Sequence, residues 1–198
     1  MEFKIREYHP GDLSSLYRIC LLTGNNGEDA SGLFDDPDLN GHYYAAPYAV
    51  LEPDLCFILT QFEKPVGYIL GTRDSDKFYE MCEEKWFPPL RKKYKLEKLT
   101  GNAVQDGLIR MIHAGHKIKN ELLDYPAHLH IDILPSGQGR GLGRQLMDVF
   151  LNKLKSLNVP AVHLEVEKAN KRAVNFYQHS GFFQIKEYEI KIAFGKVL

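Results

Sequence analysis

The feature that most constrains this chain is a glycine turn, Gln138-Gly139-Arg140-Gly141-Leu142-Gly143, which joins a predicted strand to a predicted helix. Glycines at alternate positions let a ligand approach the main chain closely, and the first turn of a helix has amides without intrahelical partners. The positive end of the helix dipole favours negative charge at the same place. Arg140 and Arg144 add cationic side chains beside it. The turn therefore predicts a site for a phosphate or pyrophosphate.

Two common phosphate-binding motifs do not fit the glycine turn. A nucleoside-triphosphate loop ends in Gly-Lys-Ser or Gly-Lys-Thr, whereas here the last glycine is followed by Arg144-Gln145. A dinucleotide fingerprint needs the spacing G-x-G-x-x-G, and neither Gly137 nor Gly139 has a glycine five residues later. The residues alone therefore specify an anion and not the molecule that carries it. The structural alternative is a helix start that needs glycine only for close packing on a strand.

Hydrophobic periodicity predicts strands and helices that alternate in the second half of the chain. The glycine turn is preceded by a strand over 127–134, and the helix after it has one apolar side, formed by Leu142, Leu146, Val149, Phe150, Leu154 and Leu157. The other predicted elements are a strand with Phe3 and Ile5 on one face, a helix over 13–21 that Asp12 is placed to cap, a hairpin over 55–71, a strand over 161–166, a helix over 170–179 and closing strands over 182–194. The pattern favours parallel pairing in the second half and antiparallel hairpins in the first.

Composition limits the classes of function. The 198 residues fit one domain with a continuous apolar core. A formal net charge of −1 gives no overall field that attracts nucleic acid. No apolar run approaches the ~20 residues that cross a bilayer, and the first eight residues lack a signal-peptide pattern. The sequence therefore predicts a cytoplasmic, intracellular protein without a nucleic-acid or membrane partner.

Cysteine usage predicts neither a disulfide framework nor a metal site. The three cysteines have no C-x-x-C spacing and are interpreted as reduced core thiols: Cys20, Cys56 and Cys82. A catalytic thiol is the alternative, because eight histidines are available as partners. No cysteine, however, lies at a turn marked by glycine.

Two further segments leave alternatives open. Residues 23–40 are rich in Gly, Asn and Asp and are interpreted as a loop with a short helix, either a solvated connection or part of an acceptor site. Residues 74–124 mix helix and loop and contain the basic run 91–95. Such a run forms either a solvated face or a site that screens acidic substrates or a phosphate.

A second motif lies downstream of the glycine turn: Asn170-Lys171-Arg172-Ala173, followed by Phe176-Tyr177 and Gly181-Phe182. Together with the glycine turn, which follows Ile133-Leu134-Pro135, it resembles the two signatures of the GNAT (Gcn5-related N-acetyltransferase) family. The resemblance covers the chain from Phe3 to the closing strands. It implies an α/β (α+β) fold with a central, mixed, mostly antiparallel sheet flanked by helices, in which strands four and five splay apart after a bulge. It also implies a single domain over 1–198 with a helical insertion around 74–124.

The first half of the chain is similar in particular to the acetyltransferase-like domain of O-GlcNAcase and its stand-alone bacterial relatives. The similar residues are Leu22-Thr23-Gly24 with Asp29-Ala30, Ala46-Pro47-Tyr48, Glu52-Pro53, Gly67-Tyr68 and Trp86. That subgroup also has a long insertion before its fourth strand. Acetyl transfer by that domain is itself doubtful, so this resemblance implies CoA binding more directly than turnover.

The family resemblance implies acetyl-CoA as co-substrate and an amine as acceptor, either a small molecule or a lysine of a peptide or protein. Backbone groups of Ile133 and Leu134 are expected to hold the pantetheine arm, and the amides of the glycine turn to hold the pyrophosphate. The full set of expected cofactor contacts is Ile133, Leu134, Gln138, Gly139, Arg140, Gly141, Leu142, Gly143, Arg144, Asn170, Ala173 and Tyr177. Tyr177 lies where the family places its general acid; the alternative is a packing tyrosine with a satisfied hydroxyl.

A general base is expected as well, because an amine with a pKa near 10.4 loses its proton at pH 7 at a cost of roughly 4–5 kcal/mol. Strand alternation places Asp132 on the opposite face from its neighbours, and a carboxylate on a central strand is expensive to bury without a reason. Asp132 is the first candidate and Glu165 the second. Glu167 also competes, as do His128 or His130 acting through water. The competing function is an acyl-CoA-binding or peptide-binding module without catalysis.

Overall fold

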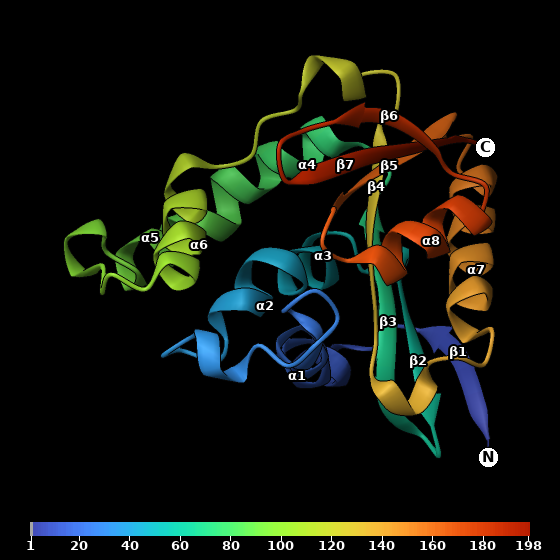
Figure 1. Ribbon diagram of the computed structural model, residues 1–198, viewed down its shortest axis with the longest axis horizontal. Helices are drawn as coiled ribbons and strands as arrows, with labels where there is room; N and C mark the ends of the chain where they lie inside the picture. Colours follow the sequence, from blue (N-terminus) through green and yellow to red (C-terminus); the bar gives the residue numbers. More distant parts are fainter. Residues whose placement is uncertain (1) are drawn as a thin grey trace.

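The computed structural model describes residues 2–198, which form a seven-stranded sheet in the order β1-β2-β3-β4-β5-β7-β6 (Figure 1). The strands are β1 (Phe3–Glu7), β2 (Cys56–Gln61), β3 (Lys64–Thr72), β4 (Ala127–Ile133), β5 (Ala161–Glu167), β6 (Phe183–Glu187) and β7 (Lys191–Val197). All neighbours are antiparallel except β4 and β5, which run parallel. The predicted mixed, mostly antiparallel sheet is therefore confirmed.

The splay between β4 and β5 is also confirmed. The two strands pair only at Ala127 with Val162 and at His128 with His163. The expected bulge, by contrast, is wrong, because the register of β3 and β4 continues without interruption from Thr72 and His128 to Gly67 and Ile133. The strands diverge because each follows its outer partner: β4 stays paired with β3, and β5 stays paired with β7 as far as Glu167.

Helices cover both faces of the sheet (Figure 1). One face is covered by α1 (Leu13–Thr23), α2 (Leu39–Tyr44) and α3 (Ala46–Leu51). The opposite face is covered by α7 (Leu142–Ser156) and α8 (Lys171–His179). The apolar side of α7 packs so closely on β3 that a Cβ added at Gly71 would lie 2.4 Å from Phe150. Phe150 is accordingly fully buried. The capping role predicted for Asp12 is wrong, because its carboxylate instead accepts from the amide of His9 at 2.9 Å and pairs with Arg6 at 2.7 Å.

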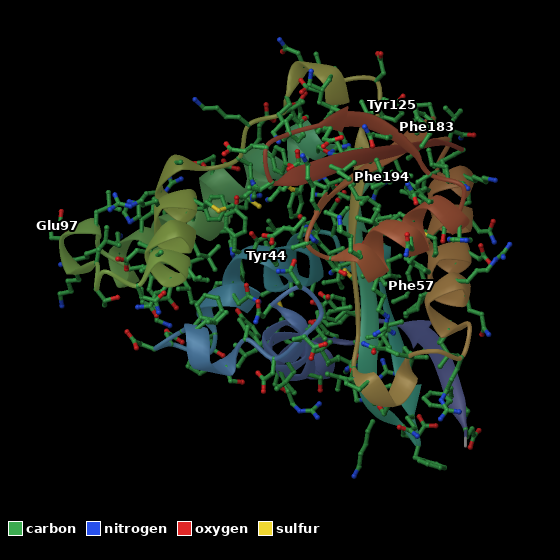
Figure 2. All side chains as sticks on the ribbon, in the orientation of Figure 1. Tyr44, Phe57, Glu97, Tyr125, Phe183 and Phe194 are labelled. Atoms are coloured by element: carbon green, nitrogen blue, oxygen red, sulfur yellow. The ribbon has the colours of Figure 1, made fainter. Side chains whose placement is uncertain are left out.

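The segment between β3 and β4 is helical and projects from the sheet beside α2, with Glu97 near its tip (Figure 2). It contains α4 (Ser75–Met81), a π-helical turn (Cys82–Trp86), α5 (Phe87–Lys93) and α6 (Ala103–Ala114). The basic run makes ion pairs within the chain, Arg91 with Glu83 and Lys93 with Asp36, each at 2.8 Å. These pairs favour the interpretation of the basic run as a solvated face.

The cysteines and the hydropathy of the helices can also be compared with the sequence predictions. Cys20, Cys56 and Cys82 are free and buried, so the interpretation as reduced core thiols is confirmed. Across residues 2–198, no helix combines the length and the apolar character that crossing a bilayer requires.

Candidate active site

The splay between β4 and β5 opens into a cavity of about 1040 Å³, called the main cavity below. Its walls are formed by β4, β5, the glycine turn, the start of α8 and the loop after α1. The predicted site residues on its walls are Asp132, Ile133, Gln138, Gly139, Gly141, Leu142, Gly143, Arg144, Glu165, Asn170, Ala173 and Tyr177. Residues from four separate segments are thus brought to one cavity.

The glycine turn presents unpaired amides to the main cavity. Gly139 and Gly141 have φ values of 70° and 74°, the left-handed region that favours glycine. In α7 the amide of Gln145 bonds to the carbonyl of Gly141 at 3.2 Å, whereas the amides of residues 139–144 have no acceptor among residues 2–198. A Cβ added at Gly139 or Gly141 would meet nothing within 4 Å, so these two glycines do not serve close packing. The turn therefore leaves open space and unpaired donors, the two features that an anion site requires.

Two predicted cofactor contacts lie outside the main cavity. The amide of Leu134 donates to the carbonyl of Val66 at 2.8 Å, and its carbonyl accepts from the amide of Gly137 at 2.9 Å. Leu134 therefore continues the pairing of β4 with β3 and is turned away from the splay. The Arg140 guanidinium lies over the ring of Phe3, 5.7 Å from its centroid, so it packs on β1.

Gln138 and Asn170 make hydrogen bonds that fix the end of β4 and the start of α8. The side-chain amide of Gln138 donates to the carbonyl of Ile133 at 2.5 Å and accepts from Arg172 at 2.6 Å, which connects the end of β4 to α8. The Asn170 side chain caps α8 by accepting from the amide of Ala173 at 3.0 Å. Its NH₂ group has no acceptor in the described part of the chain, so it is free to donate to a ligand.

Asp132 is a half-buried carboxylate that accepts a hydrogen bond from the neighbouring strand. The Tyr68 hydroxyl donates to its Oδ2 at 2.5 Å. Burial raises the pKa of Asp132 to about 6, although the hydrogen bond from Tyr68 lowers it. The carboxylate is thus mostly ionised at neutral pH and ready to accept a proton. The sequence did not predict Tyr68 as a partner of Asp132. It lies directly opposite Asp132 in the register of β3 and β4.

Tyr177 packs in the core through its ring, but its hydroxyl is not satisfied as the packing alternative requires. Its ring packs against Phe182 and Phe194, with centroids 5.9 and 6.3 Å apart. Its hydroxyl has no hydrogen-bond partner within residues 2–198, and the residue lines the main cavity. Burial and the charge of Asp132 raise the pKa of Tyr177, which keeps its proton available.

Two of the competing candidates, Glu165 and His128, are engaged by partners within the chain. Glu165 is paired with Lys119, and both ring nitrogens of His128 are engaged by Tyr48 and Ser75. Glu167 lines the cavity. Cys20 lines it too, but burial raises the pKa of its thiol, so it is protonated and is a poor nucleophile.

Comparison with known proteins identifies the family. A model described as "Acetyltransferase (GNAT) family" matches residues 108–182. The crystal structure of SsHAT is 35% identical, covers 100% of this chain with 98% of its own, and superimposes with a TM-score of 0.91. The chain belongs to the GNAT acetyltransferase family.

Two further comparisons place this GNAT chain among its relatives. Protein O-GlcNAcase of Rattus norvegicus is 28% identical over 192 residues, which cover 94% of this chain and 21% of that protein. This GNAT chain therefore spans about a fifth of the length of that curated relative. The PaiA N-acetyltransferase of Thermoplasma acidophilum, solved in complex with coenzyme A, shares the fold with a TM-score of 0.62 at 13% identity over 100% of both chains.

Acid should destabilise this GNAT chain. Burial lowers the pKa of His116 and of His130 to about 4, whereas unfolded histidine titrates near 6.5. As pH falls from 6.5 towards 4, these histidines bind protons in the unfolded state but not in the folded state. The free energy of unfolding present above pH 6.5 is therefore lost, by up to about 3 kcal/mol per histidine. Asp132 and Glu52, whose pKa values burial raises, act in the opposite direction. They are outnumbered, because burial also lowers the pKa of His42, His128 and His163. Urea unfolding across this pH range measures the loss.

The control separates these histidines from the others. His116→Gln should make the pH dependence shallower, and the same substitution at the exposed His179 should leave it unchanged. A free energy of unfolding that is constant between pH 7 and pH 4.5 would contradict the expectation.

Proposed function

We propose that this chain transfers an acetyl group from acetyl-CoA to a primary amine by direct attack. The observation that carries the proposal is the pairing, in one cavity, of unpaired amides on the glycine turn with Asp132 and Tyr177. The amides and the helix dipole suit the pyrophosphate of acetyl-CoA. The open edges of β4 and β5, which separate after His128 and His163, give the pantetheine arm a slot between strands.

Each side chain then has a defined task. Asp132 takes a proton from the acceptor ammonium, and its pKa of about 6 is close enough to neutrality for efficient transfer. The neutral amine attacks the thioester carbonyl, so that a C–N bond forms and the C–S bond breaks. Tyr177 donates its proton to the departing thiolate, and the proton left on the new amide nitrogen passes to solvent.

The first test is binding of acetyl-CoA. A ligand at a hundredfold excess over its Kd should stabilise the folded state by about 2.7 kcal/mol, because it binds the folded state alone. Thermal unfolding with millimolar acetyl-CoA measures the effect, and adenosine at the same concentration, which lacks the pyrophosphate, is the control. No shift in Tm with acetyl-CoA would count against the proposal.

The second test is transfer. Thiol release from acetyl-CoA is followed with a panel of small primary amines in one arm and lysine-containing peptides in the other. Release that depends on an acceptor supports the enzyme, and the arm that responds identifies the class of acceptor. Tight binding of acetyl-CoA without transfer to any amine would instead support the non-catalytic acyl-CoA-binding module.

A further inference from the structure

A chain of hydrogen bonds runs through the helical layer to His130. It starts at Ser75, whose Oγ donates to the carbonyl of Pro126 at 2.7 Å. A hydroxyl has a single proton, so Ser75 can only accept from the second partner of its Oγ, the Nδ1 of His128, also at 2.7 Å. The proton of the His128 ring therefore lies on Nδ1.

The position of the His128 proton also determines the protons on Tyr48 and His130. Burial keeps the pKa of His128 well below its usual range, so the ring is neutral and its Nε2 is bare. The Tyr48 hydroxyl lies 2.7 Å from that nitrogen and must donate to it. Tyr48 can then only accept from the Nε2 of His130, at 3.1 Å. His130 is neutral as well, because burial lowers its pKa to about 4, and so its Nδ1 has no proton.

His130 lies where two cavities meet. His130 lines both the main cavity and a second cavity of about 140 Å³, and the two also share Tyr44, Glu165 and Lys191. Tyr44, at the end of α2, lies between that helix and the sheet (Figure 2) and meets the His130 ring edge-on at 5.7 Å. The Nδ1 atom has no partner among residues 2–198. Strand alternation places His130 on the same face as Asp132, two residues later.

We propose that His130 is an acceptor-positioning residue, locked by Tyr48, His128 and Ser75 in the tautomer whose Nδ1 accepts a hydrogen bond from an N–H of the acceptor amine. This inference rests on the proposed function. His130 is too weakly basic to hold the proton of an ammonium ion, so it complements Asp132: the carboxylate takes the proton, and the imidazole then aims the neutral amine. A primary or secondary amine keeps an N–H after it has given a proton to Asp132, so it can still donate a hydrogen bond to His130. A hydroxyl acceptor has a single proton and can serve either His130 or Asp132, but not both.

The tautomer can be tested without any turnover. Long-range ¹H–¹⁵N NMR of the whole protein distinguishes protonated from bare ring nitrogens, and we expect His128 protonated at Nδ1 and His130 protonated at Nε2. Tyr48→Phe removes the acceptor of the His130 proton and should give a mixture of tautomers at His130. A His130 ring protonated at Nδ1, or a mixture already present in the wild type, overturns the proposal.

Kinetics test the contact with the acceptor. His130→Asn and Tyr48→Phe should each raise the KM for the acceptor about fivefold to tenfold, the usual worth of one hydrogen bond, and leave the Kd of acetyl-CoA unchanged. Tyr125→Phe, outside both cavities, is the control for loss of a tyrosine hydroxyl, and thermal unfolding identifies any variant that does not fold.

The two failures are distinguishable. An unchanged acceptor KM in a folded His130→Asn variant overturns the positioning role and leaves the proposed function intact. The predicted tautomers in a wild-type protein that acetylates no amine would mean that the proposed function has failed, and the positioning role with it.

Discussion

Asp132→Asn should lower the turnover of acetyl transfer on the order of a hundredfold or more while acetyl-CoA binds as before. The substitution keeps the shape of the side chain, and its amide oxygen can still accept the hydrogen bond that Tyr68 donates at 2.5 Å. What is lost is the group that takes the proton from the acceptor ammonium. Steady-state thiol release measures the turnover, and calorimetric titration measures the affinity for acetyl-CoA.

Tyr177→Phe is the matched variant, because it also preserves shape but removes an acid. Both variants should be slow at pH 7. Only Asp132→Asn should recover as pH rises towards 10, since the acceptor amine then loses its proton without help. An unchanged rate in Asp132→Asn would transfer the role of base to Glu165 or to solvent.

Gly141→Val should abolish the stabilisation by acetyl-CoA. Gly141 precedes the first residue of α7 with φ at 74°, and a branched side chain is strained in that region. A Cβ there would meet nothing within 4 Å in the chain, so the added isopropyl group would project into the open space that the proposed pyrophosphate needs. The Tm shift with millimolar acetyl-CoA measures the loss.

The control for that variant uses a glycine with the same backbone demand elsewhere. Gly101, in the helical insertion, has φ at 89° and equally open surroundings, but it does not line the main cavity. Gly101→Val should therefore carry a comparable backbone strain and keep the full response to acetyl-CoA. A Gly141→Val protein that still responds fully would remove the glycine turn from the binding site.

Local patterns in the sequence were sufficient for the parts of the site that are themselves local. The glycine turn, Asn170 and Tyr177 belong to short motifs, and the structure brings all of them to the main cavity. Leu134 and Arg140 lie in the same motifs but face elsewhere. Their directions depend on Val66 and Phe3, which are distant in sequence and reach them only through the pairing of β1, β2, β3 and β4. The absence of the expected bulge has the same origin, since it is set by the register with β3.

The partners of buried polar groups were the least predictable part. Strand alternation places His128 and His130 on one face, but nothing local indicates that Tyr48 lies between them, 80 and 82 residues away. The ion pair of Glu165 with Lys119 likewise joins β5 to the loop after α6. Such contacts depend on how the insertion folds back on the sheet, which periodicity does not specify.

We expect the short parallel ladder between β4 and β5 to divide the sheet into two cooperative units. Strands β1 to β4 form one continuous hydrogen-bonded block and strands β5 to β7 form the other, yet only two residue pairs join them. Amides at this seam should exchange with solvent through local opening well before the centres of either block. A ligand that lies across the seam contacts both blocks, so its binding free energy would slow exchange in strands that it never touches.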